Sequence, residues 1–167
     1  MPDAPGDLDF AGGVTAATDE VGSAGGLALR SRFSFVSWGY VGGRIGIELT
    51  APAAEASAVP TLLSLGLSGG VQSGRLWRLT ARAGGFLDGL RADDWPCSDG
   101  RSDDYGWRVG YTGAVCLWLF RLWGHPGGLE LNVSHQLTRI GEHFSGGFAA
   151  GLFFTGVLLP EPDVVPR

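Results

Sequence analysis

The sequence predicts an all-β fold, namely a single-domain, eight-stranded antiparallel up-and-down transmembrane β-barrel. The first observation is that successive segments alternate apolar residues with small or polar ones, which is the period of a strand with two unlike faces. The second is composition: hydrophobic residues make up 44% of the chain and charged residues only 17%, and all 12 basic residues are Arg. A water-exposed surface normally carries more charge than this. The third is that many of the 29 Gly lie on the polar face, where small side chains suit a narrow barrel interior.

The clearest strand covers residues 129–138, where every even position is polar and every odd position except His135 is apolar. A strand over residues 25–40 is long for a soluble protein and suits a tilted membrane crossing. The first strand, residues 7–17, has a weak register because Ala and Gly fill most of it. The remaining strands are expected at residues 44–51, 61–71, 75–90, 105–122 and 144–157.

The connections between these strands differ in length. Short, Gly-rich turns are expected at residues 41–43, 72–74 and 124–128, because glycine supplies the backbone conformations that hairpins need. Longer connections are expected at residues 52–60 and 91–104. Short turns on one side and longer loops on the other are typical of outer-membrane barrels, so both termini are expected in the periplasm. We expect residues 1–6 to form an N-terminal periplasmic stub, residues 7–157 the barrel, and residues 158–167 a disordered tail or linker stub.

The direction of the two faces decides between a membrane barrel and a soluble one. A soluble lipocalin-like barrel would put the apolar face inside and bind a ligand there. The opposite face holds too many small residues, such as Gly46, Gly66 and Gly110, for a solvated surface. We therefore expect the apolar face to meet lipid, with barrel closure satisfying the backbone hydrogen bonds at membrane depth.

Charged residues share the face that is expected to point inward. In so narrow a lumen each charge has to be paired or hydrated, so we expect a network of Arg–carboxylate contacts that fills and rigidifies the barrel. A narrow, anion-favouring small-solute channel, gated by rearrangement of those pairs, is the functional alternative. The expected lumen network consists of Arg30, Arg32, Arg44, Glu48, Arg78, Arg82, Asp88, Arg108 and Glu130.

Aromatic residues gather near the expected strand ends. Indole and phenol rings prefer the boundary between headgroups and acyl chains. We therefore expect two girdles, an inner one beside the short turns and an outer one at the far ends of the strands. The expected interface aromatics are Trp38, Tyr40, Trp77, Tyr105, Trp107, Trp118 and Trp123.

In strand number, alternation and loop asymmetry, residues 7–157 resemble the eight-stranded outer-membrane barrels of Gram-negative bacteria of the outer membrane protein A, X and W type. The resemblance includes no family-specific motif. It implies a bacterial outer-membrane location, and the lipid bilayer, lipopolysaccharide and the barrel assembly machinery as partners, with an extracellular or periplasmic protein as a further candidate. Such barrels commonly end on an aromatic residue, whereas Phe153 and Phe154 are followed here by residues 155–167. The assembly signal is therefore internal, or a further segment follows.

Two features leave alternatives open. The acidic loop at residues 91–104 lacks EF-hand spacing, so a solvated external loop is favoured over weak divalent-ion binding. The two cysteines, Cys97 and Cys116, could form a disulfide in an oxidising compartment. Such a bond requires the loop to fold into the lumen, because Cys116 lies well down a strand on the inward face, and free thiols are therefore favoured.

No catalytic, metal or cofactor site stands out. His125, His135 and His143 lack metal-ligand spacing. His135 is expected on the lipid face, where it resembles the lipid-facing His of outer-membrane lipid A deacylases. Those enzymes have a Ser two residues further on, and this chain has Leu137. We therefore expect a non-enzymatic protein, with a lipid-modifying enzyme as the minor alternative.

Composition excludes other classes. A net charge of −5 and a pI near 5.0 argue against nucleic acid as a partner. No apolar run reaches the length of a membrane-spanning helix. The N-terminus does not resemble a signal peptide, so we expect a mature sequence with an added or retained Met. A structural or surface-interaction role is the function expected of the barrel.

Overall fold

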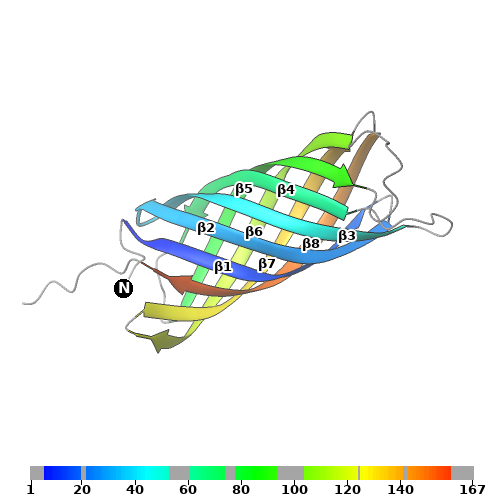
Figure 1. Ribbon diagram of the computed structural model, residues 1–167. Coiled ribbons are helices and arrows are strands. Elements are labelled where there is room, and N and C mark those ends of the chain that lie inside the picture. Colours follow the sequence, from blue (N-terminus) through cyan, green and yellow to red (C-terminus); the bar gives the residue numbers. More distant parts are fainter. Residues whose placement is uncertain are drawn as a thin grey trace, which may run out of the picture.

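The computed structural model describes residues 6–19, 22–52, 61–73, 78–93, 104–123, 125–140 and 143–158. Eight antiparallel strands close into one barrel, each pairing with its neighbours along the chain, and β1 with β8 completes the ring (Figure 1). The strands are β1 (Leu8–Asp19), β2 (Gly22–Val36), β3 (Gly39–Pro52), β4 (Thr61–Gln72), β5 (Leu79–Asp93), β6 (Asp104–Leu122), β7 (His125–Ile140) and β8 (His143–Val157). The predicted fold class is confirmed.

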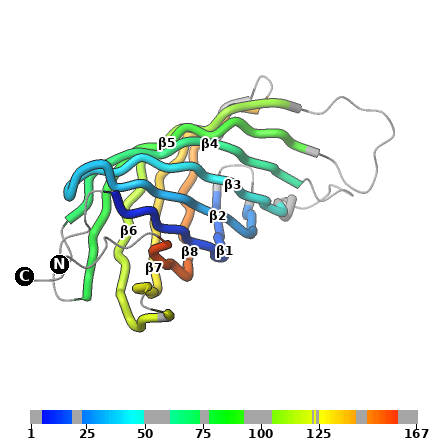
Figure 2. Tube along the Cα trace, turned by 60° about the vertical axis from the view of Figure 1, so that its left-hand side comes forward, coloured from blue at the N-terminus to red at the C-terminus, as the bar shows by residue number. Residues whose placement is uncertain are grey.

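Both ends of the described chain lie at the same end of the barrel. The amide of Gly6 donates to the Ser34 carbonyl, and the amide of Leu158 donates to the Leu8 carbonyl. The β2–β3 turn at residues 37–38 lies at this end, which we call the terminal end, together with the strand ends that flank residues 73–78 and 123–124 (Figure 2). At the opposite end lie the strand ends that flank residues 20–21, 53–60, 94–103 and 141–142. Loop asymmetry is therefore only partial, because the links at residues 20–21 and 141–142, at the opposite end, contain two residues each.

The first predicted turn is in the wrong place. Val36 pairs with Gly39 around residues 37–38, and Val41, Gly42 and Gly43 lie within β3. Gly42 lets β2 and β3 approach closely and does not form a turn, since a Cβ there would collide with the Ser31 carbonyl on β2. The third predicted turn is also displaced, because β7 begins at His125 and the link is at residues 123–124.

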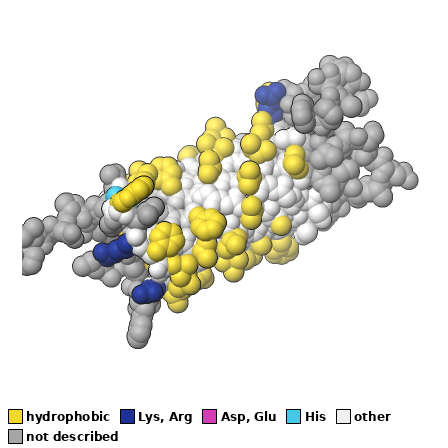
Figure 3. Space-filling model, turned by 60° about the horizontal axis from the view of Figure 1, so that its bottom comes forward, with side chains coloured by type: hydrophobic (Ala, Val, Ile, Leu, Met, Phe, Trp, Pro, Cys, Tyr) yellow, Lys and Arg dark blue, Asp and Glu magenta, His cyan; other side chains and the backbone are white. Residues whose placement is uncertain are grey.

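The apolar face of the sheet points outward, as predicted. Leu65, Leu67 and Phe154 are 68%, 71% and 68% exposed. Figure 3 shows hydrophobic side chains over the middle of the visible face and Arg side chains only towards its two ends. The exposed arginines, Arg78, Arg91, Arg121 and Arg139, all lie at or near strand ends. The outer surface is thus an apolar belt bounded by charge, the inverse of a soluble lipocalin-like barrel.

The interior is filled by alternating large and small side chains. Gly110 makes room for the ring of Phe86, and Gly151 makes room for the ring of Phe153, because a Cβ at either glycine would meet that ring. Phe153 is fully buried. Small residues on the inward face are therefore required by packing, as expected for a narrow barrel. No helix long and apolar enough to cross a membrane occurs in the described ranges.

Candidate functional site: the charged lumen

Charged side chains from six strands meet inside the barrel in two separate clusters. Strand alternation places them there, because each lies on the same parity as the small inward residues of its strand. The terminal cluster consists of Asp9, Arg32, Arg82 and Glu130. The opposite cluster consists of Arg44, Glu48, Asp88 and Arg108. Each cluster contains two arginines and two carboxylates, so its charge is balanced.

The terminal cluster is a closed ring of four ion pairs. Arg32 donates from Nε to Asp9 Oδ1 at 2.7 Å and from Nη1 to Glu130 Oε2 at 2.5 Å. Arg82 donates from Nη2 to Asp9 Oδ2 and from Nη1 to Glu130 Oε2, both at 2.9 Å. All four side chains are at least nine-tenths buried. Each guanidinium bridges both carboxylates, so strands β1, β2, β5 and β7 are tied across the lumen.

Neutral side chains extend the terminal cluster. Arg82 Nε donates to Gln72 Oε1 at 3.3 Å, and Gln72 Nε2 donates to Ser34 Oγ at 2.9 Å. Arg32 Nη2 lies 3.5 Å from Thr155 Oγ1. Hydrogen bonds therefore run around the barrel at this level, which fixes the side chains and leaves little free width.

The opposite cluster is looser. Arg108 Nη1 donates to both oxygens of Glu48, at 2.9 and 3.1 Å, and Arg108 Nε donates to Asp88 Oδ2 at 3.3 Å. Arg44 Nε lies 3.4 Å from Asp88 Oδ1, an oxygen that accepts no hydrogen bond within the described chain. Arg44 also stacks over the Phe86 ring, with 3.9 Å from Cζ to the centroid. Arg44 is therefore held mainly by stacking and charge.

Arg30 lies between the two clusters. Its Nη2 donates to Asn132 Oδ1 at 3.2 Å, and its Nη1 lies 3.6 Å from Glu130 Oε1, which is beyond hydrogen-bond distance. Its guanidinium stacks over the Phe153 ring at 4.0 Å. Two small cavities, of about 20 and 30 Å³, lie on either side of it. Both are small, with room for ordered water.

Most of the residues predicted for the lumen network lie in these clusters or between them. Arg78 does not, because it precedes β5 at the terminal end and its side chain is exposed. Sequence reasoning missed Asp9, which joins both arginines of the terminal cluster. The sequence does indicate an inward side chain for Asp9, because Asp9 alternates with the apolar residues Leu8 and Phe10. That signal was overlooked because the rest of the strand is rich in Ala and Gly.

Two of the predicted interface aromatics point inward instead. Tyr40 is 4% exposed and lines the smaller cavity, and Trp118 is 5% exposed and donates from Nε1 to Thr80 Oγ1 at 3.0 Å. Both share the inward parity, Tyr40 with Arg44 on β3 and Trp118 with Arg108 on β6. Strand alternation therefore overrides the general preference of aromatics for the interface.

The other predicted aromatics divide between the two ends. Trp38 and Trp123 are 62% and 89% exposed at the terminal end, and Tyr105 and Trp107 are 65% and 38% exposed at the opposite end. Trp77 lies outside the described residues. Trp123 has a positive φ of 51°, which the tight β6–β7 link imposes on a residue type that rarely adopts it. Exposed rings therefore occur at both rims of the apolar belt.

The cysteines and histidines of the described residues lie apart from one another. Cys116 is a fully buried free thiol in the lumen, and Cys97 lies outside the described residues. His135 points outward and packs against the Phe148 ring, with centroids 4.9 Å apart. Within the described ranges, no group of His, Cys, Asp or Glu side chains is arranged to hold a metal ion.

Comparison with solved structures places this architecture among eight-stranded outer-membrane barrels. The outer membrane protein OprG from Pseudomonas aeruginosa matches with a TM-score of 0.62 and 12% identity, covering 94% of this chain and 98% of OprG. The outer membrane protein AlkL, solved in lipid bilayers, matches with a TM-score of 0.57 and 12% identity, covering 98% and 95%. Neisserial surface protein A matches with a TM-score of 0.55 and 15% identity, covering 92% and 96%.

These similarities establish the fold and confirm the resemblance that the sequence suggested. No protein-family model and no curated protein sequence matches the chain.

Proposed function

We propose that this chain is an integral protein of a bacterial outer membrane, in which a closed, side-chain-filled barrel acts as a structural or surface-interaction scaffold. The observation that carries the proposal is the inverted barrel: an exposed apolar belt surrounds a lumen sealed by paired charges. Exposed apolar surface of this extent is costly in water and favourable against acyl chains. The structural similarity to outer-membrane barrels supports the same location.

The positions of the longer links support one orientation of this barrel in the membrane. We place the terminal end in the periplasm and the opposite end outside the cell, with lipopolysaccharide around the outer rim. In this orientation the links at residues 53–60 and 94–103 connect strands on the outer side of the barrel, and loops on a rigid scaffold are where binding residues commonly lie. An external protein is thus a candidate partner, and the barrel assembly machinery is the expected partner during insertion.

Orientation can be tested with epitope tags on intact cells. A tag inserted within residues 94–103 is expected to bind antibody without permeabilisation. A matched tag within residues 74–77 is expected to bind only after the outer membrane is opened. The reverse pattern would overturn the orientation.

The sealed lumen can be tested by conductance. Folded protein in planar bilayers is expected to show no large, steady openings, since eight strands leave room only for side chains. Steady openings of high conductance would contradict the plugged scaffold.

A narrow anion-favouring channel is the second candidate, and the four arginines that line the smaller lumen cavity favour it. This candidate predicts small currents that select chloride over potassium and that lose selectivity in an Arg30→Gln variant. An Arg121→Gln variant, altered at an exposed strand end, is the matched control. Absence of current in the wild-type protein leaves the scaffold role as the better account.

The proposed scaffold is non-enzymatic. Leu137 stands where the deacylase resemblance requires a hydroxyl, and it points outward on β7 beside the lipid phase. A chromatographic assay for acyl chains released from lipopolysaccharide tests this directly, and release above that of a boiled sample would contradict it.

A further inference from the structure

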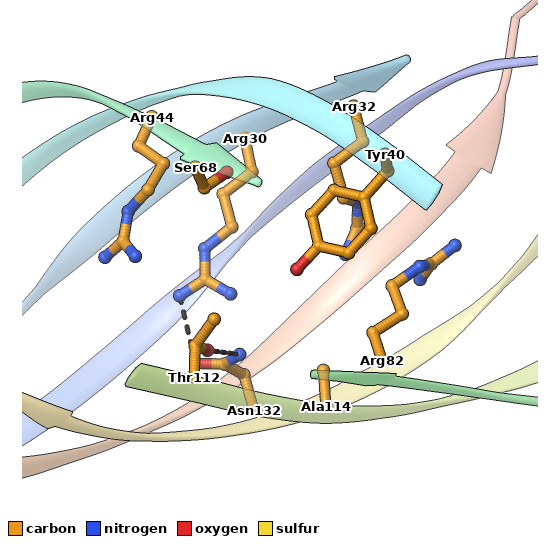
Figure 4. A pocket seen from close by; sticks show the side chains of 9 residues that line it. All are labelled: Arg30, Arg32, Tyr40, Arg44, Ser68, Arg82, Thr112, Ala114 and Asn132. Atoms are coloured by element: carbon orange, nitrogen blue, oxygen red, sulfur yellow. Dashed lines mark hydrogen bonds between the residues drawn. The ribbon is translucent and has the colours of Figure 1, made fainter. Parts of the chain in front are cut away.

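The smaller cavity in the lumen is lined by cationic and hydroxyl groups. Four arginines surround it, together with Tyr40 and Ser68 (Figure 4). Those arginines are Arg30, Arg32, Arg44 and Arg82, and no acidic side chain lines the cavity. Its volume is about 20 Å³, which is small but above the minimum that one water molecule needs. The cavity is thus a small space lined by positive charge.

Two of these arginines are direct cross-strand neighbours. Arg30 on β2 pairs in register with Arg44 on β3, and both side chains point inward. Like charges directly opposite each other on one face of a sheet repel. Such a pair is stable inside a barrel when something negative lies between or beside the two guanidinium groups.

Arg30 and Arg44 are incompletely paired by the protein. The Arg30 side chain is only 10% exposed, and its Nε has no hydrogen-bond partner within the described chain. The nearest carboxylate oxygens lie 3.6 Å from Arg30 and 3.4 Å from Arg44, and neither oxygen accepts a hydrogen bond there. A buried charge with unmade hydrogen bonds carries a large desolvation cost.

The middle of the lumen is rich in positive charge. Both four-residue clusters are balanced, and Arg30 adds a further cation between them. A water molecule in the cavity would supply hydrogen-bond acceptors but would not offset the positive charge around it. A monovalent anion does both.

We propose that the cavity is a binding site for a single halide ion, held between the Arg30 and Arg44 guanidinium groups with Tyr40 and Ser68 as hydroxyl donors. A halide is smaller than phosphate, sulfate or a carboxylate ion, each of which has several heavy atoms, and it therefore suits a small cavity better. Chloride is the abundant halide. The site would offset the positive charge of these arginines and lock the barrel, whether or not the barrel conducts ions.

The direct test is diffraction from crystals grown in bromide salt. An anomalous peak in contact with both Arg30 and Arg44 is expected. Density there without an anomalous signal would mean water and would overturn the proposal, and so would a bromide peak elsewhere in the lumen only.

A solution test separates a functional site from binding at crystal concentration only. The protein is unfolded by urea in lipid vesicles at constant ionic strength, with chloride replaced by glutamate, a much larger anion. The unfolding constant is expected to fall in proportion to 1 + [Cl⁻]/Kd, or about elevenfold at ten times Kd. No change between the two salts would overturn the proposal.

Three variants assign the effect to this cavity. Arg44→Gln is expected to lose the chloride dependence, whereas Arg121→Gln, at an exposed strand end, is expected to keep it. Ser68→Asp places a carboxylate at the cavity wall and is expected to fold in glutamate salt with no response to chloride. If Arg44→Gln does not fold, Ser68→Asp decides. Retention of the wild-type chloride response in either lumen variant would overturn the proposal.

Discussion

The Glu130→Gln substitution tests whether the terminal cluster holds the barrel together. Glu130 is fully buried, and its Oε2 accepts short hydrogen bonds from Arg32 and Arg82. Hydrogen bonds to charged groups contribute about 1.5–3 kcal/mol each, and removing one partner from a buried ion pair costs about 3–5 kcal/mol. Glutamine keeps the volume and one acceptor but leaves two guanidinium groups short of a counter-charge. We therefore expect the free energy of unfolding to fall by about 3–5 kcal/mol.

The assay is urea unfolding of protein refolded into phospholipid vesicles, followed by tryptophan fluorescence. Glu48→Gln is the matched control, since Glu48 accepts its hydrogen bonds from one arginine, Arg108, and its side chain is 14% exposed. Glu48→Gln is expected to lower the free energy of unfolding by clearly less than Glu130→Gln does. A loss below about 1 kcal/mol for Glu130→Gln, typical of an exposed pair, would show that the lumen is hydrated and would refute the reasoning.

Three further predictions concern packing, the outer face and the buried thiol. Gly66→Ala should prevent barrel folding, because a Cβ there would collide with a buried carboxylate and the backbone of β5. Gly113→Ala should fold normally, because a Cβ there would have no heavy atom within 4 Å. Heat-modifiable migration on gels distinguishes folded from unfolded barrel, and equal behaviour of the two variants would contradict the packing argument. Leu65→Arg should lower the free energy of unfolding in vesicles by about 2–4 kcal/mol, and a neutral effect would show that this position faces water. In a Cys97→Ser background, Cys116 should react with a thiol reagent only after unfolding, because it is fully buried; rapid labelling of the folded protein would mean that the lumen is open.

Strand alternation was the part of the sequence that predicted most of the structure. In the segment around Glu130 the alternation predicts both faces of the strand correctly, because Leu131 and Val133 point outward and Asn132 and Ser134 point inward. The same parity rule applied strictly would have placed Trp118 and Tyr40 in the lumen. These two side chains were predicted on the wrong face because residue type was given more weight than position in the strand. In a narrow barrel a single inward aromatic can fill the space that glycine leaves, so residue type alone does not identify the face.

The hairpin positions and the cluster geometry could not be predicted from the sequence. Gly42 and Gly43 have the composition of a turn, yet close strand approach places them within β3. The pairing of Asp9 with Arg82 joins strands that are far apart in the chain and depends on the register of the whole closed ring. Parity predicts which residues enter the lumen. Which of these residues meet depends on how the strands are staggered around the closed barrel.

The contact between the outer face and lipid is the central claim, and spin-label accessibility tests it most directly. Single nitroxide labels at Leu65 and Leu131 on the outer face and at Ser134 in the lumen, in a background without native cysteines, are measured in lipid vesicles. We predict that labels at the two leucines collide more often with oxygen, which concentrates in acyl chains, than with a water-soluble nickel reagent. The label at Ser134 should be shielded from both. Preferential collision of the leucine labels with the nickel reagent would contradict the account.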